Sequence, residues 1–230
     1  MTAEEQNRTP DLSECIKEGI RAAMLNINTC MPGIVQSYSP LKNTADVQPV
    51  FKRKYENGDT ADIPVIRNVP VAFPRAGTAA ITFPIKPNDN VLLLFSQRTL
   101  DQWKTFGGKI QPNDPRTHDL SDAIAIPGVY PASDPVPIDP DNLVIRNLLS
   151  KIIVKKTGDM TLQAGGAIIE MTKSGQVKMG NGVVDLLDLV DKLLDAILKM
   201  SVGTALGPST PPLNSAEFTA IKTQLATIKG

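Results

Sequence analysis

The densest group of side chains that could do chemistry lies between residues 114 and 122. Asp114, Asp119 and Asp122 surround His118, the only histidine of the chain. Carboxylates beside an imidazole are the donor set of a metal site or of a general acid–base pair. Aspartates in proline-rich loops also form turns and cap short helices. The proline- and aspartate-rich surroundings favour this second role.

Other catalytic signals are missing from the sequence. Asp59 and Asp62 flank a predicted hairpin turn, where turn formation is again the simpler role. The chain contains no G-x-S-x-G nucleophile motif, no GxxxxGK[ST] phosphate loop and no zinc-type cysteine cluster. We therefore expect a protein that is not an enzyme and that carries no cofactor.

A basic run between two aromatic residues suggests a different kind of chemistry. Phe51 and Tyr55 enclose Lys52, Arg53 and Lys54, the composition that a barrel uses to stack single-stranded nucleic acid. However, the 24 basic and 24 acidic side chains cancel, so no basic groove supports the run. We expect no nucleic acid as a partner. A single-stranded nucleic-acid-binding module with a helical oligomerisation tail remains the alternative function.

The elements that would hold these residues begin with a helix and a barrel. Residues 1–28 predict an amphipathic helix with Thr9 as N-cap and Pro10 at its first position. Residues 29–135 form the second predicted domain, an OB-fold barrel with a proline-rich connector, in which Trp103 is expected to lie in the core or to plug the barrel. The predicted strands are 29–38, 47–55, 61–73, 78–86 and 91–97, and residues 107–141 are expected to be mostly loop.

The pattern changes in the third predicted domain, residues 136–182. Short runs alternate apolar and polar residues, and glycines separate the runs. Each run offers one narrow apolar face, which suits stacked strands contributed by several chains to one needle. The inward residues of this trimer core are predicted to be Ile152, Val154, Met160, Leu162, Ile169, Met171, Val177 and Met179.

The last predicted domain, residues 183–230, is a helical hairpin. In residues 183–200 the charged residues Asp185, Asp188, Asp191 and Asp195 recur every three or four positions. We expect them to form a solvated outer face, with i,i+4 pairs from Asp188 to Lys192 and from Asp195 to Lys199. Asn214 and Glu217 have capping-box spacing before the second helix. The apolar bundle residues are predicted to be Leu186, Val190, Leu193, Ile197, Phe218, Ile221 and Leu225.

Several uncommon sequence words point to a family. MPGIVQSY (31–38), NVPVAFPRAG (68–77), FPIKPNDNVLLLFSQRTLDQW (83–103) and HDLSDAIAIPGVYP (118–131) appear in collinear order. Residues 25–132 thereby resemble the N-terminal OB-fold domain of phage baseplate central spikes, the membrane-puncturing needles of contractile tails. The resemblance implies a homotrimer on the tail tube, and it implies that the following repeats form a short intertwined triple-stranded β-helix.

One departure from this family concerns the tip. Many such spikes hold iron through a His-x-His pair from each chain, but this sequence contains no His-x-His. Either three hairpins form a six-helix bundle that caps the needle, or the hairpin docks a separate tip protein. The expected fold class is mainly β with helical termini. The expected role is that of a structural virion protein that pierces the host envelope. It would be made in the host cytoplasm and would lie at the distal tip of the baseplate, where it contacts hub and tail-tube proteins.

Overall fold

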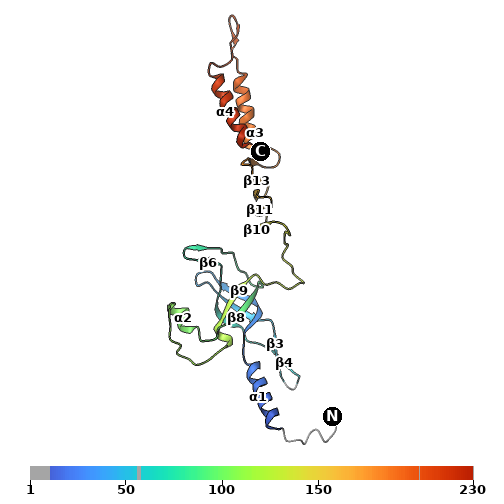
Figure 1. The fold of residues 1–230 in the computed structure, drawn as a ribbon, viewed down its shortest axis with the longest axis vertical. Coiled ribbons are helices and arrows are strands. Elements are labelled where there is room, and N and C mark those ends of the chain that lie inside the picture. The colour runs from blue at the N-terminus through green and yellow to red at the C-terminus, as the bar shows by residue number, and fades with distance from the viewer. Residues whose placement is uncertain (1–10, 56–57, 202, 230) are drawn as a thin grey trace. The chain divides into compact units, whose positions relative to one another are not determined.

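The structure is a computed structural model that describes residues 11–55, 58–201 and 203–229. The chain divides into two compact units, Met1–Val136 and Pro137–Gly230. Figure 1 shows the order of their elements along the chain. Within the described residues, none of the helices is long and apolar enough to cross a membrane.

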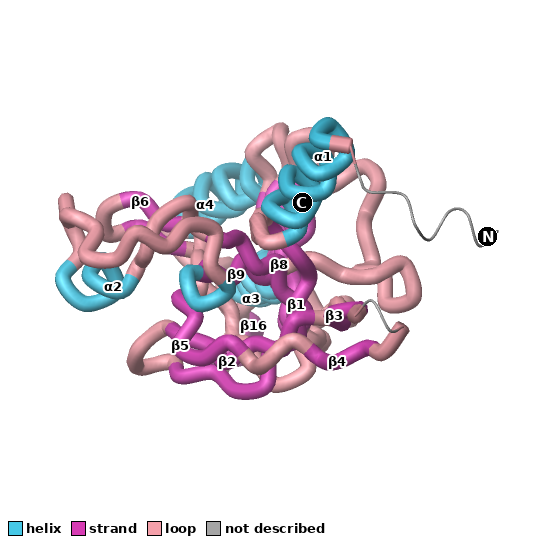
Figure 2. The backbone as a smooth tube through the Cα atoms, turned by 90° about the horizontal axis from the view of Figure 1, so that it is seen from below, coloured by secondary structure: helices cyan, strands magenta, loops and turns pink. Residues whose placement is uncertain are grey.

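The first unit is built on a curled, five-stranded antiparallel sheet. Its strands are β1 (Cys30–Ser39), β2 (Thr44–Pro49), β5 (Ile66–Pro70), β8 (Asn90–Phe95) and β9 (Ala123–Pro127), in the order β5-β2-β1-β8-β9. Figure 2 shows β1 between β2 and β8 in this sheet. A parallel bridge between Val71 and Ala125 brings the two outer strands together. The result is a half-barrel with the strand order of an OB-like fold.

Alternating side chains from these strands form the core of the half-barrel. Val35, Val47, Val69, Val91 and Leu93 are each completely buried. Gly33 is also buried, and a Cβ atom there would lie 2.5 Å from Val47 Cγ1. Only glycine therefore allows β1 to approach its neighbours this closely.

Two features of the barrel differ from the sequence-based expectation. Residues 107–141 are mostly loop, as predicted, but they also contain the last sheet strand, β9, which was not predicted. In turn, residues 78–86 contain only the two-residue strand β7 (Ala79–Ala80), which pairs with β6 (Arg75–Ala76) outside the main sheet. The range 61–73 splits into β5 and the small strand β4 (Thr60–Asp62), which pairs with β3 (Lys52–Lys54). Here pairing partners, rather than local propensity, decide which residues become strands.

The helices of the first unit lie on its surface. Helix α1 (Leu12–Leu25) is capped by Asp11 and buries none of its residues. The predicted cap, Thr9-Pro10, lies outside the described residues. Helix α2 (Asp101–Phe106) carries Trp103, whose exposed fraction is 42%, so the prediction that this tryptophan lies in the core is wrong. A 3-10 turn, η2 (Leu120–Asp122), precedes β9.

The second unit begins with a five-stranded antiparallel meander. Its strands are β10 (Leu143–Asn147), β11 (Ser150–Val154), β12 (Met160–Ala164), β13 (Ala167–Met171) and β14 (Val177–Gly180), paired in chain order. Gly158, Gly165 and Gly175 take positive φ angles of 95°, 58° and 86° in three of the four turns. Glycine adopts this conformation without a steric penalty, which explains the spacing of the breaks in the sequence.

The second unit ends in the predicted helical hairpin. Helices α3 (Leu186–Leu198) and α4 (Ser215–Ile228) pack side by side, and the small strands β15 (Gly203–Thr204) and β16 (Gly207–Pro208) lie between them in sequence. Figure 1 shows this antiparallel pair. Asn214 makes no side-chain capping bond at the start of α4, in contrast to the prediction for this residue.

Candidate functional site

The five-stranded meander presents one apolar face. Residues paired directly across an antiparallel sheet point to the same side, so the register defines two rows of side chains. Leu143, Val154, Met160, Met171 and Val177 form the first row, and Ile145, Ile152, Leu162, Ile169 and Met179 form the second. The eight residues predicted for the trimer core thus all lie on this face, together with Leu143 and Ile145.

The opposite face of the meander is mostly polar. Its polar residues are Arg146, Lys151, Thr161, Gln163, Glu170 and Lys178, and its apolar residues are Val144, Ile153 and Ile168. A sheet with one apolar and one polar face normally packs its apolar face against another layer. The described chain supplies no such layer, because Leu143 is 63% exposed, Ile145 55% and Ile152 39%, and none of the ten residues in the two rows is buried.

The hairpin pairs its charges internally. Lys222 of α4 forms ion pairs with Asp191 and Asp195 of α3, and Lys229 pairs with Asp188 at 2.8 Å and with Asp191 at 2.7 Å. The hydrogen bond from Lys229 lowers the pKa of both Asp188 and Asp191. The predicted solvated outer face with i,i+4 pairs is therefore wrong, because the aspartates face the second helix.

The predicted bundle residues of the hairpin differ in how far their side chains are buried. Phe218 and Leu225 are partly buried on the side of α4 that also carries Lys222. Val190 and Ile197 are partly buried on α3. In contrast, Leu186, Leu193 and Ile221 are exposed, at 50%, 59% and 49%. Apolar side chains thus remain on the outside of the hairpin.

Asp185 joins the hairpin to the end of the meander. Its carboxylate accepts hydrogen bonds from the amides of Leu187 and Asp188, as an N-cap residue does, and a further bond from the amide of Met179 in β14. A Cβ atom on Gly180 would lie 2.1 Å from the carbonyl oxygen of Val184, so the joint also requires a glycine. The end of α4 makes a second contact with the meander, because the Lys229 carbonyl accepts a bond from the Gln176 side chain. The meander is therefore tied to both helices of the hairpin, at the end where α3 begins and α4 ends.

The aspartate and histidine cluster is organised around an arginine. Arg116 donates to Asp122 at 2.7 Å, to Asp101 at 2.6 Å and to Asp114 at 3.2 Å. Asp119 instead accepts bonds from the amide and hydroxyl groups of Ser121, which is the predicted turn role.

Asp122 is the buried member of this network. Its side chain is only 1% exposed, and burial raises the pKa of its carboxyl group. Hydrogen bonds from Arg116 and from the Leu100 amide outweigh this effect and lower the pKa overall. Sequence reasoning missed Arg116, because a single arginine in a loop carries no periodic signal.

His118 and the described acidic residues do not form a metal site. The His118 ring nitrogen Nδ1 lies 3.1 Å from the carbonyl oxygen of Asn28, whose side chain in turn donates to the His118 carbonyl. The described part of the chain contains no group of three or more metal-ligating side chains that could hold an ion. The cluster therefore connects the segment before β1 to the loop before β9.

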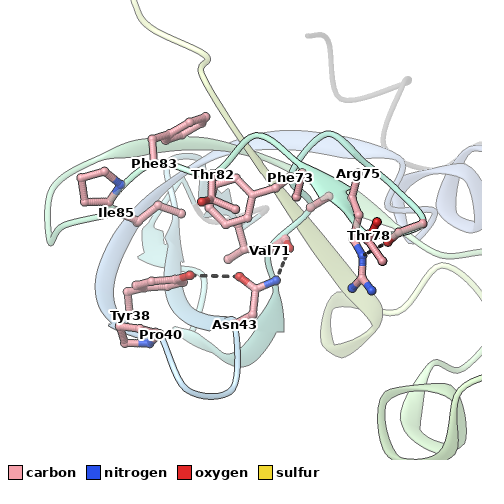
Figure 3. Close-up of a pocket in the computed structure, with 14 residues that line it drawn as sticks. Tyr38, Pro40, Asn43, Val71, Phe73, Arg75, Thr78, Thr82, Phe83 and Ile85 are labelled. Carbon is pink, nitrogen blue, oxygen red and sulfur yellow. Dashed lines mark hydrogen bonds between the residues drawn. The ribbon is translucent and has the colours of Figure 1, made fainter. Parts of the chain in front are cut away.

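A hollow of about 890 Å³ lies beside the half-barrel, between the end of β1 and residues 71–85. Figure 3 shows Tyr38 and Asn43 on one side of it and Phe73 and Phe83 on the other. Tyr38 donates to Asn43, Asn43 donates to the Val71 carbonyl, and the two phenylalanine rings meet edge to face at 5.1 Å. The described lining residues include no carboxylate, histidine or cysteine, so the hollow offers no acid–base pair.

The basic run of the sequence lies on a separate small hairpin. Lys52, Arg53 and Lys54 form strand β3 and are all exposed, as are Phe51 and Tyr55 at its ends. Lys52 pairs with Asp62 at 3.4 Å on the neighbouring strand. This carboxylate reduces the positive charge that the hairpin presents.

Comparison with known proteins gives a family match within the first unit of the chain. Residues 31–128 match the family model described as phage protein Gp138 N-terminal domain. The matched segment covers the half-barrel and supports a phage structural protein. No curated protein matches the chain. The family match does not extend to the apolar meander face and the hairpin, so the function of these parts must be argued from their own residues.

Proposed function

We propose that the protein is the trimeric central spike of a contractile phage tail, which pierces the host cell envelope during injection. The match of residues 31–128 to a phage protein domain supports the connection with a virion. The observation that carries the finer proposal is the uncovered two-row apolar face of the meander. Complete burial of one exposed Leu, Ile or Met side chain stabilises by about 1.5–3 kcal/mol, so covering this face in an assembly would offset part of the entropy cost of association.

Three copies around one axis would bury these faces together. The five strands pair consecutively within one chain, so each chain can supply one whole side of a three-sided body. This arrangement differs from the intertwined β-helix that the sequence resemblance implies, because the five strands pair with one another within each chain. The apolar rows would point to the axis, and the face with Arg146, Lys151 and Lys178 would point to solvent. When the apolar rows of all three copies are buried at the axis, neither row of any sheet stays exposed, which favours a stiff, closed oligomer.

The proposed role is mechanical and involves no catalysis. Contraction of the tail sheath would supply the force, and the spike would transmit it to the envelope. Such a part needs stiffness and slow unfolding rather than an active site. The half-barrels would contact hub and tail-tube proteins, in the place that the sequence resemblance implies.

The mass and shape of the purified full-length protein test this proposal. We expect light scattering to give three times the 24.7 kDa chain mass, and small-angle scattering to give an elongated particle. A monomer at micromolar concentration would contradict the spike. Tail particles labelled by antibodies against residues 137–230 at the baseplate would support the location, and labelling elsewhere on the virion would contradict it.

The exposed hairpin of β3 and β4 favours one other candidate function. Lys52, Arg53 and Lys54 stand between two exposed aromatic side chains, which is a small platform for single-stranded nucleic acid. Retention on single-stranded DNA that falls steeply as salt increases would support this function. Absence of retention at low salt would remove it.

A further inference from the structure

Helix α3 has an apolar stripe that its partner helix covers only in part. Leu187, Leu194 and Leu198 lie on the side facing α4, where Leu194 is only 7% exposed. A second set recurs at alternating steps of four and three residues, which is the spacing of a coiled-coil seam. This set, the α3 stripe, consists of Leu186, Val190, Leu193, Ile197 and Met200. Leu193 and Met200 are 59% and 56% exposed, whereas Val190 and Ile197 are partly buried, so the described chain leaves much of the stripe uncovered.

Helix α4 has two adjoining edges. The first edge carries Phe218, Lys222, Leu225 and Lys229, which are all partly buried toward α3. The second edge carries Ile221 and Ile228, which are 49% and 47% exposed. At about 100° per residue the two edges lie about 90° apart around the helix. A helix with two such edges fits into the groove between two other helices.

We propose that three hairpins pack into a six-helix bundle, with the α3 stripes at its centre and each α4 in the groove between its own α3 and the α3 of a neighbouring copy. The occupant of the uncovered apolar face is thus a second copy of this chain rather than a separate tip protein. This inference rests on the proposed trimer. The Asp185 bonds to both β14 and α3 tie the hairpin to the meander, so both parts would share one three-fold axis.

The ion pairs fix which residues meet across the copies. Lys222 lies at the height of Asp191 and Asp195, and Lys229 lies at the height of Asp188 and Asp191. Ile221 is therefore level with Ala196, and Ile228 is level with Leu189. On α3, both Ala196 and Leu189 lie beside the stripe, on the side away from the chain's own α4. A neighbouring α4 would approach there, and the small side chain of Ala196 permits a close approach.

Charge complementarity supports the same contact. Lys199 at the end of α3 and Glu217 in the first turn of α4 lie at about the same height in the antiparallel hairpin. Both side chains are exposed, and neither forms an ion pair with another described residue of the chain. In the bundle, Lys199 of one copy faces Glu217 of the next. Opposite charges at this position favour the copy over a partner of unrelated sequence.

Disulfide crosslinking in the full-length chain tests the contact. Cys15 and Cys30, which are both exposed, are first replaced by serine, and Ala196→Cys and Ile221→Cys are then introduced together. After mild oxidation we expect most of the protein to run as covalent trimers on a non-reducing denaturing gel, because each copy bonds to the next around the ring. The matched control is Ala196→Cys with Thr219→Cys, since Thr219 lies at a similar height on the far side of α4. The control pair should form fewer than one tenth as many trimers.

The outcomes separate this inference from the proposed function. A native mass of three chains without covalent trimers would overturn the bundle and leave the spike intact, since something else would then cover the stripe. Covalent dimers without trimers would overturn the three-fold arrangement. A native mass of one chain would overturn both proposals. If the cysteine pair prevents folding, a second experiment compares Leu193→Asp with the control Lys192→Asp. We expect amide hydrogen exchange in α3 to be at least tenfold faster in Leu193→Asp than in the control. Equal exchange rates in the two variants would contradict the bundle.

Discussion

Lys229, just after α4, lies 2.7 Å from a carboxylate oxygen of Asp191 on α3. Together with the Lys222 pairs, this contact places charged side chains between the two helices, beside the buried Leu194. In a soluble hairpin the charged residues normally face water and apolar residues fill the space between the helices. Because charged residues take part of that space here, apolar residues such as Leu193 remain exposed, which indicates that the hairpin is built to pack against further helices.

The first prediction concerns these ion pairs. Lys222→Met removes the charge but keeps a long side chain, so we expect a lower melting temperature of the second unit at low salt. The loss should shrink as salt increases, because salt already screens the wild-type pairs. The control Lys192→Met changes an exposed lysine of α3 that forms no described ion pair. Thermal unfolding followed by circular dichroism at 20 mM and 500 mM salt would measure the difference, and equal losses in both variants would contradict the prediction.

The second prediction concerns the apolar face of the meander. Leu162→Asp would place a carboxylate at the centre of this face, three times around the proposed axis. Because each buried unpaired charge costs several kcal/mol, we expect the trimer to be lost. The control Gln163→Asp adds the same charge on the opposite face of β12 and should leave the mass unchanged. A stable trimer of Leu162→Asp in light scattering would refute the arrangement.

The third prediction follows from the lowered pKa of Asp122. A carboxyl group whose pKa is lower in the folded state adds stability above its unfolded value of about 3.8, and this stability is lost as the pH falls through the folded value. We expect the first unit to lose stability below about pH 4. Asp122→Asn should cost about 3 kcal/mol at pH 7, since it leaves Arg116 without its buried partner, and should flatten the acid dependence.

The measurement for this prediction is urea unfolding at several pH values between 2.5 and 7, followed by a signal from the first unit such as Trp103 fluorescence. The control is Asp119→Asn, which removes a carboxylate that caps η2 but does not bind Arg116. Parallel pH curves for the wild type and Asp122→Asn would contradict the assignment.

The sequence predicts much of the fold where hydrophobic alternation is strong. Strands β1 and β8 lie within one or two residues of their predicted ranges, and the alternation of the meander places its apolar residues on one face. Strand β9 was missed because its residues, AIAIP, are short and small and lie within a proline-rich segment. It becomes a strand because β8 offers a free edge on one side, a tertiary cause that no local pattern contains.

The charged side chains were harder to predict than the apolar ones. The spacing of Asp188 and Lys192 fits an i,i+4 pair, but it also leaves the aspartate available to a lysine on another helix. Asp188 pairs with Lys229 and not with Lys192, because Lys229 contacts both Asp188 and Asp191 at once. In the same way, Arg116 satisfies Asp101, Asp114 and Asp122, which are up to 21 residues apart in sequence. Such partners follow from the fold and cannot be read from spacing.

The fourth prediction concerns the joint between the meander and the hairpin. Gly180→Ala would place a methyl carbon 2.1 Å from the backbone oxygen of Val184, and a backbone atom cannot move aside as a flexible side chain can. We expect a loss of about 2–3 kcal/mol, at the upper end of the usual cost of overpacking. Gly166→Ala is the control, because a Cβ atom there meets nothing within 4 Å.

Chemical denaturation followed by far-ultraviolet circular dichroism would compare the two glycine variants. Equal free energies of unfolding for Gly180→Ala and Gly166→Ala would contradict the prediction, because the backbone at the joint would then have moved to accept the methyl group.

The fifth prediction uses the one turn of the meander that lacks glycine at its strained position. Leu148, between β10 and β11, has a φ angle of 52°, whereas glycines take the positive angles in the other three turns. For a residue other than glycine or asparagine this conformation costs about 1–2 kcal/mol. Leu148→Asn should therefore stabilise the protein by up to about 1 kcal/mol. The control Leu149→Asn removes a neighbouring exposed leucine without relieving backbone strain. If the control raises the free energy of unfolding by the same amount, the cause is the removal of exposed apolar surface and not the relief of strain.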